Sequence, residues 1–143
     1  MQKEPPILLH HCLYFTANSL ARAISRMTEE EFRITGISPP HAFLLMLVNA
    51  NPGISQKELA QQLHLTPSTV TRFIDHLVHR GYLARRTEGK ISKIYPTAKG
   101  NQLQETIGLA WHRVYERYSE LLGEAYGRQL TQMTDQASQI LGQ

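Results

Sequence analysis

The stretch LAQQLHLTPSTVTRFIDHLVHRGYLARR, residues 59–86, contains the signals that decide the fold. Thr66 followed by Pro67 is an N-cap with proline at the first helical position, and Gly81 marks the end of the helix that begins there. Just before this stretch, residues 55–58 have the capping-box pattern and begin a short helix that we expect to end near residue 64. Two capped helices joined by a turn of about three residues predict a helix-turn-helix unit.

The helix predicted for residues 66–80 has two unlike faces when each position is given about 100° of rotation. Its apolar stripe, which should face the core, consists of Val70, Phe73, Ile74 and Leu77. The opposite side carries Ser68, Arg72, Asp75, His76 and His79, with Thr69 and Thr71 on the flanks. A polar face with an arginine at its centre suits the major groove of B-DNA, which is about 12 Å wide and accepts a helix. We expect Arg72 to contact a guanine edge or a phosphate, and Asp75 to orient Arg72 or another cation.

A hairpin follows this helix. Residues 82–86 and 91–95 are predicted strands, and the turn between them contains a glycine. Its four cations are Arg85, Arg86, Lys90 and Lys93. They are too many for two short strands to neutralise internally, so we expect them to contact the DNA backbone or the minor groove.

Basic side chains gather in the middle of the chain. Residues 55–100 hold eight cations and three acids, a local net charge of +5, whereas the net charge of the whole chain is +3. This asymmetry indicates a polyanion as the partner of the middle segment. On charge alone, a solvated basic face without a partner would explain it equally well.

Longer helices flank the middle segment on both sides. Residues 7–33 and 98–122 have apolar side chains spaced by three or four, and Gly123 and Gly127 separate the second helix from a last amphipathic one. Residues 39–49 form a helix that is apolar all round and should be enclosed by other elements. The predicted fold is mainly α: a winged helix-turn-helix of about six helices and a short two- or three-stranded β wing.

The outer helices predict a homodimer, because residues 1–36 and 98–143 leave apolar faces that one chain cannot cover alone. Trp111, Tyr115 and Tyr118 add aromatic area in the same region. Obligate homodimers bury such faces against a second copy. Two recognition helices would then meet successive major grooves about 34 Å apart, which predicts a roughly palindromic site. A helical core closed within one chain is the alternative.

The stretch quoted above, the hairpin and the following PTAKG (residues 96–100) resemble the winged helix-turn-helix of the multiple antibiotic resistance regulator (MarR) family. TPSTVTR (66–72) and YLARR (82–86) are the most specific pieces, and the order of the helices matches over nearly the whole chain. The resemblance implies one domain over residues 1–143, with residues 55–96 as the DNA-binding lobe and helices from both termini as the dimerisation region. It also implies a transcriptional regulator, in the form of a ligand-responsive repressor, whose partners are double-stranded DNA and a second copy of the chain.

The resemblance also transfers site residues. The predicted DNA-binding residues are Ser55, Gln56, Thr66, Pro67, Ser68, Thr69, Thr71, Arg72, His76, Arg85, Arg86, Lys90 and Lys93. The wing departs from the family pattern, because its tip is shorter and has Glu88 and Lys90 where an aspartate and arginines are usual. A lysine lacks the planar fork of an arginine and should discriminate bases less sharply.

Many members of the family release DNA when a small anionic or phenolic effector occupies the cleft between the dimer region and the lobe. The candidate effector-pocket residues that the resemblance implies are Arg22, His41 and Phe43. No residue pattern identifies the effector.

One cysteine and several histidines are candidates for a sensing role. Cys12 is a candidate redox residue, because neighbouring imidazolium groups from His10 and His11 would favour a thiolate; a packed cysteine without such a role is the alternative. His41 and His112 lie in helices where zinc-sensing relatives place ligands. Two isolated histidines make a weak site, so we expect neither a metal nor a cofactor.

Other function classes have less support. The serines, histidines and acids have no nucleophile-elbow, phosphate-loop or metalloprotease spacing, so we expect no enzyme. The absence of a long apolar run or a signal-peptide core, together with a single cysteine, predicts a cytoplasmic protein without membrane contact. Two alternatives stay open: a redox- or metal-responsive regulator of the same fold, and an anti-repressor that binds protein rather than DNA.

Overall fold

The computed structural model describes residues 8–142, and most of them are helical. The elements in chain order are α2 (Leu13–Phe32), the 3-10 helix η1 (Arg33–Thr35), α3 (Pro39–Ala50), β1 (Ile54–Ser55), α4 (Gln56–Leu63), α5 (Pro67–His79), β2 (Leu83–Glu88), β3 (Ile91–Pro96), α6 (Ala98–Leu122) and α7 (Glu124–Leu141). The mainly α winged helix-turn-helix that the sequence predicts is confirmed. None of the helices in this range is long and apolar enough to span a bilayer.

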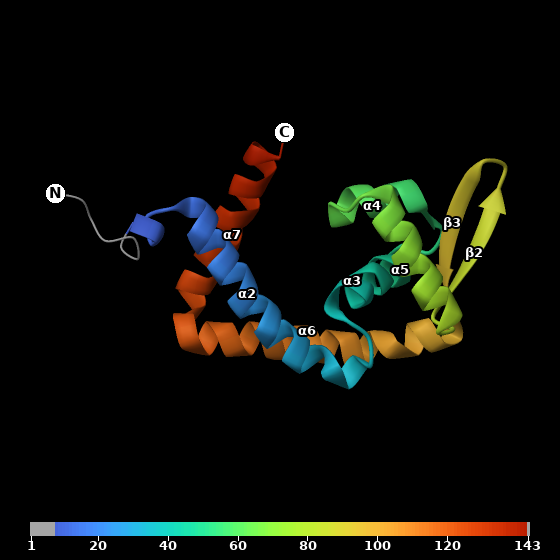
Figure 1. Cartoon of the computed structure of the whole chain (residues 1–143). Helices are drawn as coiled ribbons and strands as arrows, with labels where there is room; N and C mark the ends of the chain where they lie inside the picture. The colour runs from blue at the N-terminus through green and yellow to red at the C-terminus, as the bar shows by residue number, and fades with distance from the viewer. Residues whose placement is uncertain (1–7, 143) are drawn as a thin grey trace.

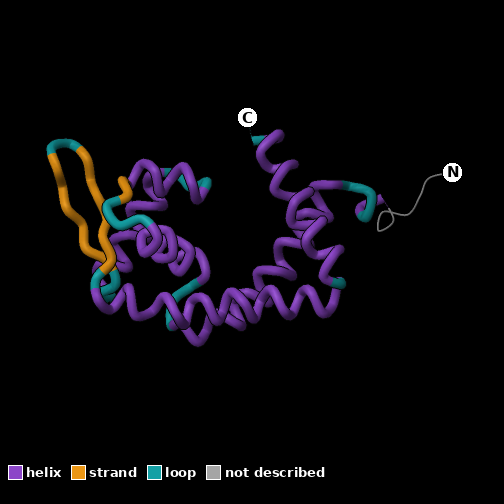
Figure 2. The backbone as a smooth tube through the Cα atoms, turned by 180° about the vertical axis from the view of Figure 1, so that it is seen from behind, coloured by secondary structure: helices purple, strands orange, loops and turns teal. Residues whose placement is uncertain are grey.

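Helix α6 forms the base of the molecule and joins its two ends (Figure 1). At one end lie α3, α4, α5 and the β hairpin, which we call the wing lobe (residues 37–97). At the other end α2 and α7 lie against α6 and form what we call the helical arm. Figure 2, from behind, shows the hairpin projecting from the wing lobe on the side away from the helical arm.

The sheet has three antiparallel strands in the order β1-β3-β2. Leu83 lies opposite Pro96 and Glu88 opposite Ile91, so β2 and β3 form a regular hairpin. The short strand β1 pairs with β3 through Ile54 and Ile94, which are both buried. β1 ends at Ser55, the N-cap residue of α4, so its pairing with β3 fixes the wing relative to the helix-turn-helix.

One apolar core fills the wing lobe and continues along α6. Leu44, Leu45 and Val48 of α3 are fully buried, which confirms the prediction that this helix is enclosed. The other fully buried side chains of the core include Leu59, Val70, Ile74, Leu77, Ile94 and Ile107. Burying a side chain of this size contributes about 1.5–3 kcal/mol, so the placement of α5 is set mainly by its apolar stripe.

Two sequence predictions about the helical arm are wrong. The helix predicted for residues 7–33 is not continuous: Leu8 and Leu9 are helical, but Cys12 is extended (φ −102°, ψ 118°), so α2 begins only at Leu13; Ile7 lies outside the described residues. Gly127 does not end a helix but lies inside α7, where it is buried and a Cβ would lie 3.2 Å from the ring of Tyr118. Gly123 alone, with φ +90°, makes the break between α6 and α7.

Candidate nucleic-acid interface

Helix α5 has the two faces that its sequence predicts. Val70, Ile74 and Leu77 have no exposed side-chain area, and Phe73 is half-buried. The exposed residues on the other face are Ser68, Arg72, Asp75, His76 and His79. The lobe therefore presents a polar helix surface to solvent with Arg72 near its middle.

A network of hydroxyl groups organises the N-terminus of α5. The Oγ1 of Thr66 accepts a hydrogen bond from the backbone N–H of Thr69 (3.3 Å), as the predicted N-cap requires. It also lies 2.8 Å from the Thr69 hydroxyl and 3.3 Å from that of Ser68. Thr69 in turn accepts a long hydrogen bond from Nη2 of Arg72, at 3.4 Å. The Arg72 guanidinium is thus directed toward the N-terminal end of the helix, where backbone N–H groups favour an anion.

Gln56 and Thr71 are joined to each other. The Gln56 amide donates to the Thr71 hydroxyl at 2.6 Å, and that hydroxyl donates to the carbonyl oxygen of Pro67 at 3.0 Å. The bond fixes the start of α4 against α5. Both residues were predicted to contact DNA, but the Thr71 hydroxyl already has a donor and an acceptor within the lobe. Ser55 likewise uses its hydroxyl to cap α4, by accepting from the N–H of Glu58.

The hairpin neutralises part of its own charge. Arg85 forms an ion pair with Asp75 of α5 (2.7 Å), and Lys93 pairs with Glu88 across the hairpin (2.9 Å). The hydrogen bond that Lys93 donates to the Glu88 carboxylate raises the pKa of Lys93 above its ordinary value. Asp75 lies outside the hairpin, so the prediction that the strands could not neutralise their cations internally is wrong for one of the four, Lys93. That Asp75 orients a cation is confirmed, with Arg85 rather than Arg72 as the partner.

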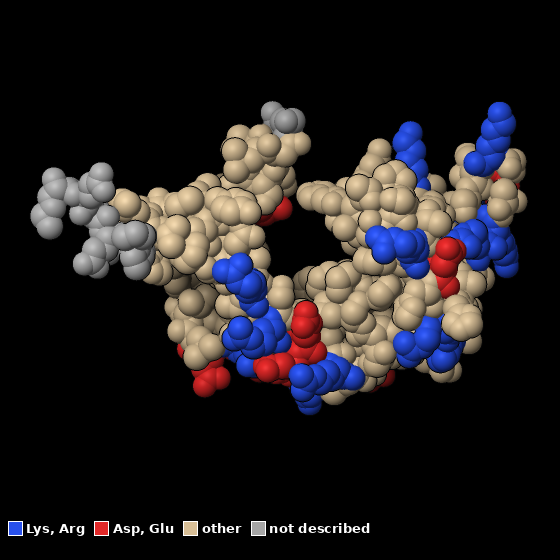
Figure 3. Space-filling model, viewed as in Figure 1, with Lys and Arg blue, Asp and Glu red and all other residues tan. Residues whose placement is uncertain are grey.

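The other two wing cations remain directed to the surface. The Arg86 guanidinium lies over the ring of Tyr95, 4.7 Å from its centre, and stays exposed. Lys90 is exposed at the turn, and within residues 8–142 no ion pair or side-chain hydrogen bond involves it. Figure 3 shows Lys and Arg side chains around α4, α5 and the hairpin, with few acidic groups between them.

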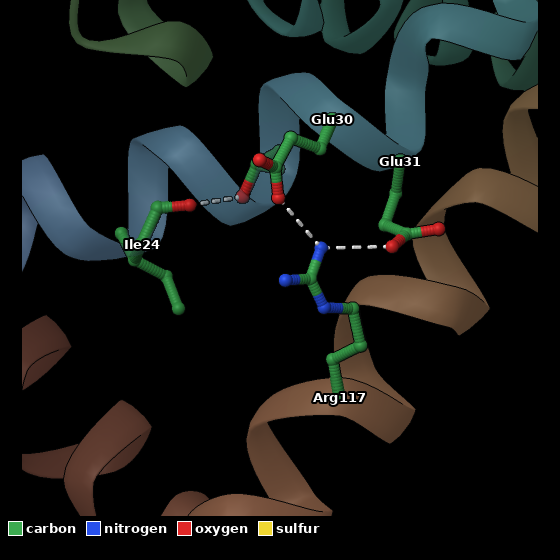
Figure 4. Close-up of polar contacts among 5 residues, drawn as sticks. Ile24, Glu30, Glu31 and Arg117 are labelled. Atoms are coloured by element: carbon green, nitrogen blue, oxygen red, sulfur yellow. Dashed lines mark hydrogen bonds and ion pairs between the residues drawn. The ribbon is translucent and has the colours of Figure 1, made fainter.

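An ion-pair cluster joins α6 to α2, and an aromatic pocket lies where the wing lobe meets these two helices. Arg117 of α6 reaches Glu30 (3.0 Å) and Glu31 (2.9 Å) in the last turn of α2, as Figure 4 shows. These hydrogen bonds, the one to Glu30 foremost, raise the pKa of Arg117. Beside this cluster is a pocket of about 210 Å³ lined by Thr28, Phe32, Phe43, Trp111, Val114, Tyr115 and Tyr118.

Of the three predicted effector-pocket residues, only Phe43 lines this pocket. Arg22 is exposed on α2 and donates to Ser19, whereas His41 contacts the rings of Phe73 and His76 on α5. The residues that sequence reasoning did not assign to a pocket include Trp111, Tyr115 and Tyr118. Their spacing by four and three was a signal for one helix face, but it was interpreted as part of a dimer surface.

The sensing candidates are not assembled into a site. Cys12 is an exposed free thiol, and His10 packs edge-on against Phe15. His112 pairs with Glu116 on its own helix, far along the chain from His41. In the described part of the chain, no three His, Cys, Asp or Glu side chains lie close enough together to hold a metal.

The helix-turn-helix, its three-stranded sheet and the helices from both ends define a winged helix-turn-helix protein. Residues 37–88 match the model of the MarR family, so the resemblance seen in the sequence is confirmed over this segment. In sequence, the chain is 29% identical over 87 residues to the uncharacterised HTH-type transcriptional regulator YybA of Bacillus subtilis (strain 168). That match spans 59% of this chain and 58% of YybA, a little over half of either protein.

Solved structures share the whole fold. The PcaV transcriptional regulator from Streptomyces coelicolor, in complex with its natural ligand, superposes with a TM-score of 0.82 at 17% identity, covering 97% of this chain and 98% of PcaV. A MarR family regulator from Listeria monocytogenes, complexed with a 26mer DNA, superposes with a TM-score of 0.76 at 22% identity, covering 91% and 89%. At these identities the comparison shows a common fold and leaves the function of this chain to be argued from its own residues.

Proposed function

We propose that this protein is a sequence-specific DNA-binding transcriptional regulator that acts as a homodimer on a roughly palindromic operator. The observation that carries the proposal is α5: three of the four side chains of its apolar stripe are fully buried, and its exposed face presents Arg72 beside a capped helix N-terminus. Proteins of this family are transcriptional regulators, and the DNA complex of the Listeria relative supports the same role here. The protein is most simply a repressor that a ligand releases from DNA.

Exposed apolar side chains on the helical arm support the homodimer. Leu13 of α2 is 69% exposed, Leu121 at the end of α6 73% and Ile140 of α7 67%. Such side chains on a monomer's surface mark an interface. A two-fold partner that covered them would leave both wing lobes outside the interface, with recognition helices about 34 Å apart for successive major grooves.

The first test is DNA binding itself. A duplex is selected by the full-length protein from a random pool, and its affinity is measured by fluorescence anisotropy while salt is raised fourfold. We expect the affinity to fall by about two or more orders of magnitude, because neutralised phosphates release counterions. Light scattering should give twice the mass of the chain. A protein that selects no duplex would contradict the proposal and favour the anti-repressor alternative.

We also infer that the aromatic pocket receives the effector. Its walls are mostly uncharged rings, which fits a small flat aromatic molecule. PcaV, of the same fold, is described in complex with its natural ligand, which supports a ligand-responsive role.

Trp111 is the single tryptophan of the chain, so its fluorescence reports directly on the pocket. Titration with salicylate and 4-hydroxybenzoate should quench this fluorescence and weaken binding to the selected duplex. Phe43→Leu should weaken the ligand about 2- to 12-fold, by loss of an aromatic contact worth about 0.5–1.5 kcal/mol. The control is Arg22→Gln, outside the pocket, which should bind as the wild type does; equal losses in both variants would place the ligand elsewhere.

A further inference from the structure

Two histidines from different helices are stacked at the junction of α3 and α5. The ring centres of His41 and His76 are 4.5 Å apart, and their planes are inclined by 33°. His41 also contacts the ring of Phe73, whose centre is 4.4 Å away. His76 belongs to the exposed face of α5, so the pair connects the surface proposed to meet DNA with the helix behind it.

The surroundings of His41 favour its neutral form. Burial of the half-buried ring lowers its pKa below the ordinary value of 6.5, and the charges of His76 and Arg80 lower it further. Among residues 8–142, the other elements packed against α3, which are α2, α4, α6 and β3, bring no charged group that counteracts these effects. Nδ1 of His41 is 2.6 Å from the Ser38 hydroxyl, which makes no capping bond to the backbone of α3. The neutral ring is therefore held by Ser38 on one side and by α5 on the other.

A second proton on this pair would be costly. Arg80 is already a permanent cation near His41 and is fixed by a hydrogen bond to the carbonyl oxygen of Gly36. Protonation of both imidazoles would place three positive charges at the junction of α3 and α5. Two interacting sites of this kind lose their protons in coupled steps, so the pair tends to hold a single proton. His76 is the ring of the pair that is exposed to solvent, whereas His41 is half-buried.

We propose that the stacked rings of His41 and His76 form a pair of coupled proton-binding sites that links the binding of DNA to pH, an inference that rests on the proposed function. With one proton, on His76, α5 gains a cation toward DNA while His41 stays neutral and packed. A second proton, on His41, separates the rings and loosens α5 from α3. Affinity for DNA then rises as pH falls toward neutrality and decreases again in acid.

The test is the affinity of the full-length protein for its selected duplex between pH 8 and pH 5 at constant ionic strength. One linked proton changes the affinity by at most about tenfold per pH unit. The wild type should show an optimum, with a decrease on the acid side. His41→Phe keeps an aromatic ring and removes the second proton site, so its affinity should not decrease in acid. His79→Gln, a histidine of the same helix outside the pair, is the control and should retain the optimum. A wild type that binds ever more tightly in acid, or a His41→Phe profile like that of the wild type, would overturn the proposal.

A second measurement needs no DNA. NMR titration of the imidazole Cε1–H signals of the free protein should show that His76→Gln raises the pKa of His41, because one of the charges that lower it is removed. An unchanged His41 titration in this variant would show that the two rings are not coupled and would also overturn the proposal. If no duplex binds at any pH, the proposed function fails, and the titration still decides whether the pair exists.

The stability of the free protein gives an independent readout with a defined sign. Because the folded-state pKa of His41 is lowered, the unfolded chain binds the proton more readily between that value and 6.5. The contribution of neutral His41 is fully present above pH 6.5 and is lost as pH falls through the lowered pKa. Urea denaturation should therefore show a smaller loss of stability in acid for His41→Phe than for the wild type. Equal losses in both proteins would contradict the assignment of a neutral His41.

Discussion

Replacing Arg72 by alanine is expected to weaken binding to the selected duplex by about 5- to 150-fold, which corresponds to about 1–3 kcal/mol. Arg72 stands in the exposed face of α5, and its guanidinium is oriented by the Thr69 hydroxyl (3.4 Å) toward the helix N-terminus. A guanidinium held in place can bind a guanine edge or a phosphate through two parallel hydrogen bonds. Anisotropy titrations with the selected duplex and with random duplexes of the same length measure the effect, and the selected duplex should lose more.

The matched control is Lys90→Ala, at the exposed tip of the hairpin. A lysine that contacts phosphates should weaken all duplexes about equally and reduce the salt dependence. Lys93 is less suitable as a control, because it forms an ion pair with Glu88. Equal losses on selected and random DNA for Arg72→Ala would remove this residue from base reading.

Replacing Gly100 by alanine is expected to lower the free energy of unfolding by about 3 kcal/mol or more, which is a large part of the stability of a typical domain. A Cβ at this position would overlap the backbone carbonyl oxygen of Tyr82 and lie 3.3 Å from Cδ1 of Leu45. The Tyr82 carbonyl cannot move freely, because it accepts the backbone N–H of Thr97 at 3.1 Å. Urea denaturation followed by circular dichroism measures the loss.

Gly108→Ala in the same helix is the control for the effect of alanine itself. No atom lies within 4 Å of the Cβ that this change adds, so helix propensity should dominate and stabilise the protein by about 0.5–1 kcal/mol. Opposite signs of the change in stability for the two variants would establish that α6 packs tightly against the backbone of the wing lobe at Gly100. A Gly100→Ala variant as stable as the wild type would show that the contact between Gly100 and the Tyr82 carbonyl is not tight.

The helix starts could be predicted because their signals are local. Ser55 and Thr66 were expected to cap helices, and each accepts a hydrogen bond from the backbone N–H three residues later, as Thr97 does at the start of α6. The burial of the α5 stripe followed in the same way from the spacing of its apolar side chains. These predictions depend on residues within a few positions of one another, so one sequence is enough to make them.

Features that depend on distant residues were not predictable in the same way. The ion pair between Asp75 and Arg85 joins a helix to a strand, and the pocket brings together α2, α3 and α6. His41 was assigned to an effector pocket, but the rotation of α3 turns it toward His76. Which of two compatible partners a side chain meets depends on the relative placement of whole elements. Periodicity identifies a face of a helix but not what lies opposite that face.

Helix α6 has one further consequence. Its 25 residues extend about 37 Å, from the tight contact of Gly100 with the wing lobe to the aromatic pocket and the helical arm. A rigid rod of that length acts as a lever: one degree of tilt at one end displaces the other by about 0.6 Å. Trp111 and Tyr118 of the pocket lie about 17 and 27 Å from Gly100 along α6, so a tilt of about five degrees at the pocket moves the wing lobe by about 1.5–2.4 Å. Under the proposed function, a ligand among the rings would use this lever to shift the recognition helix relative to the DNA.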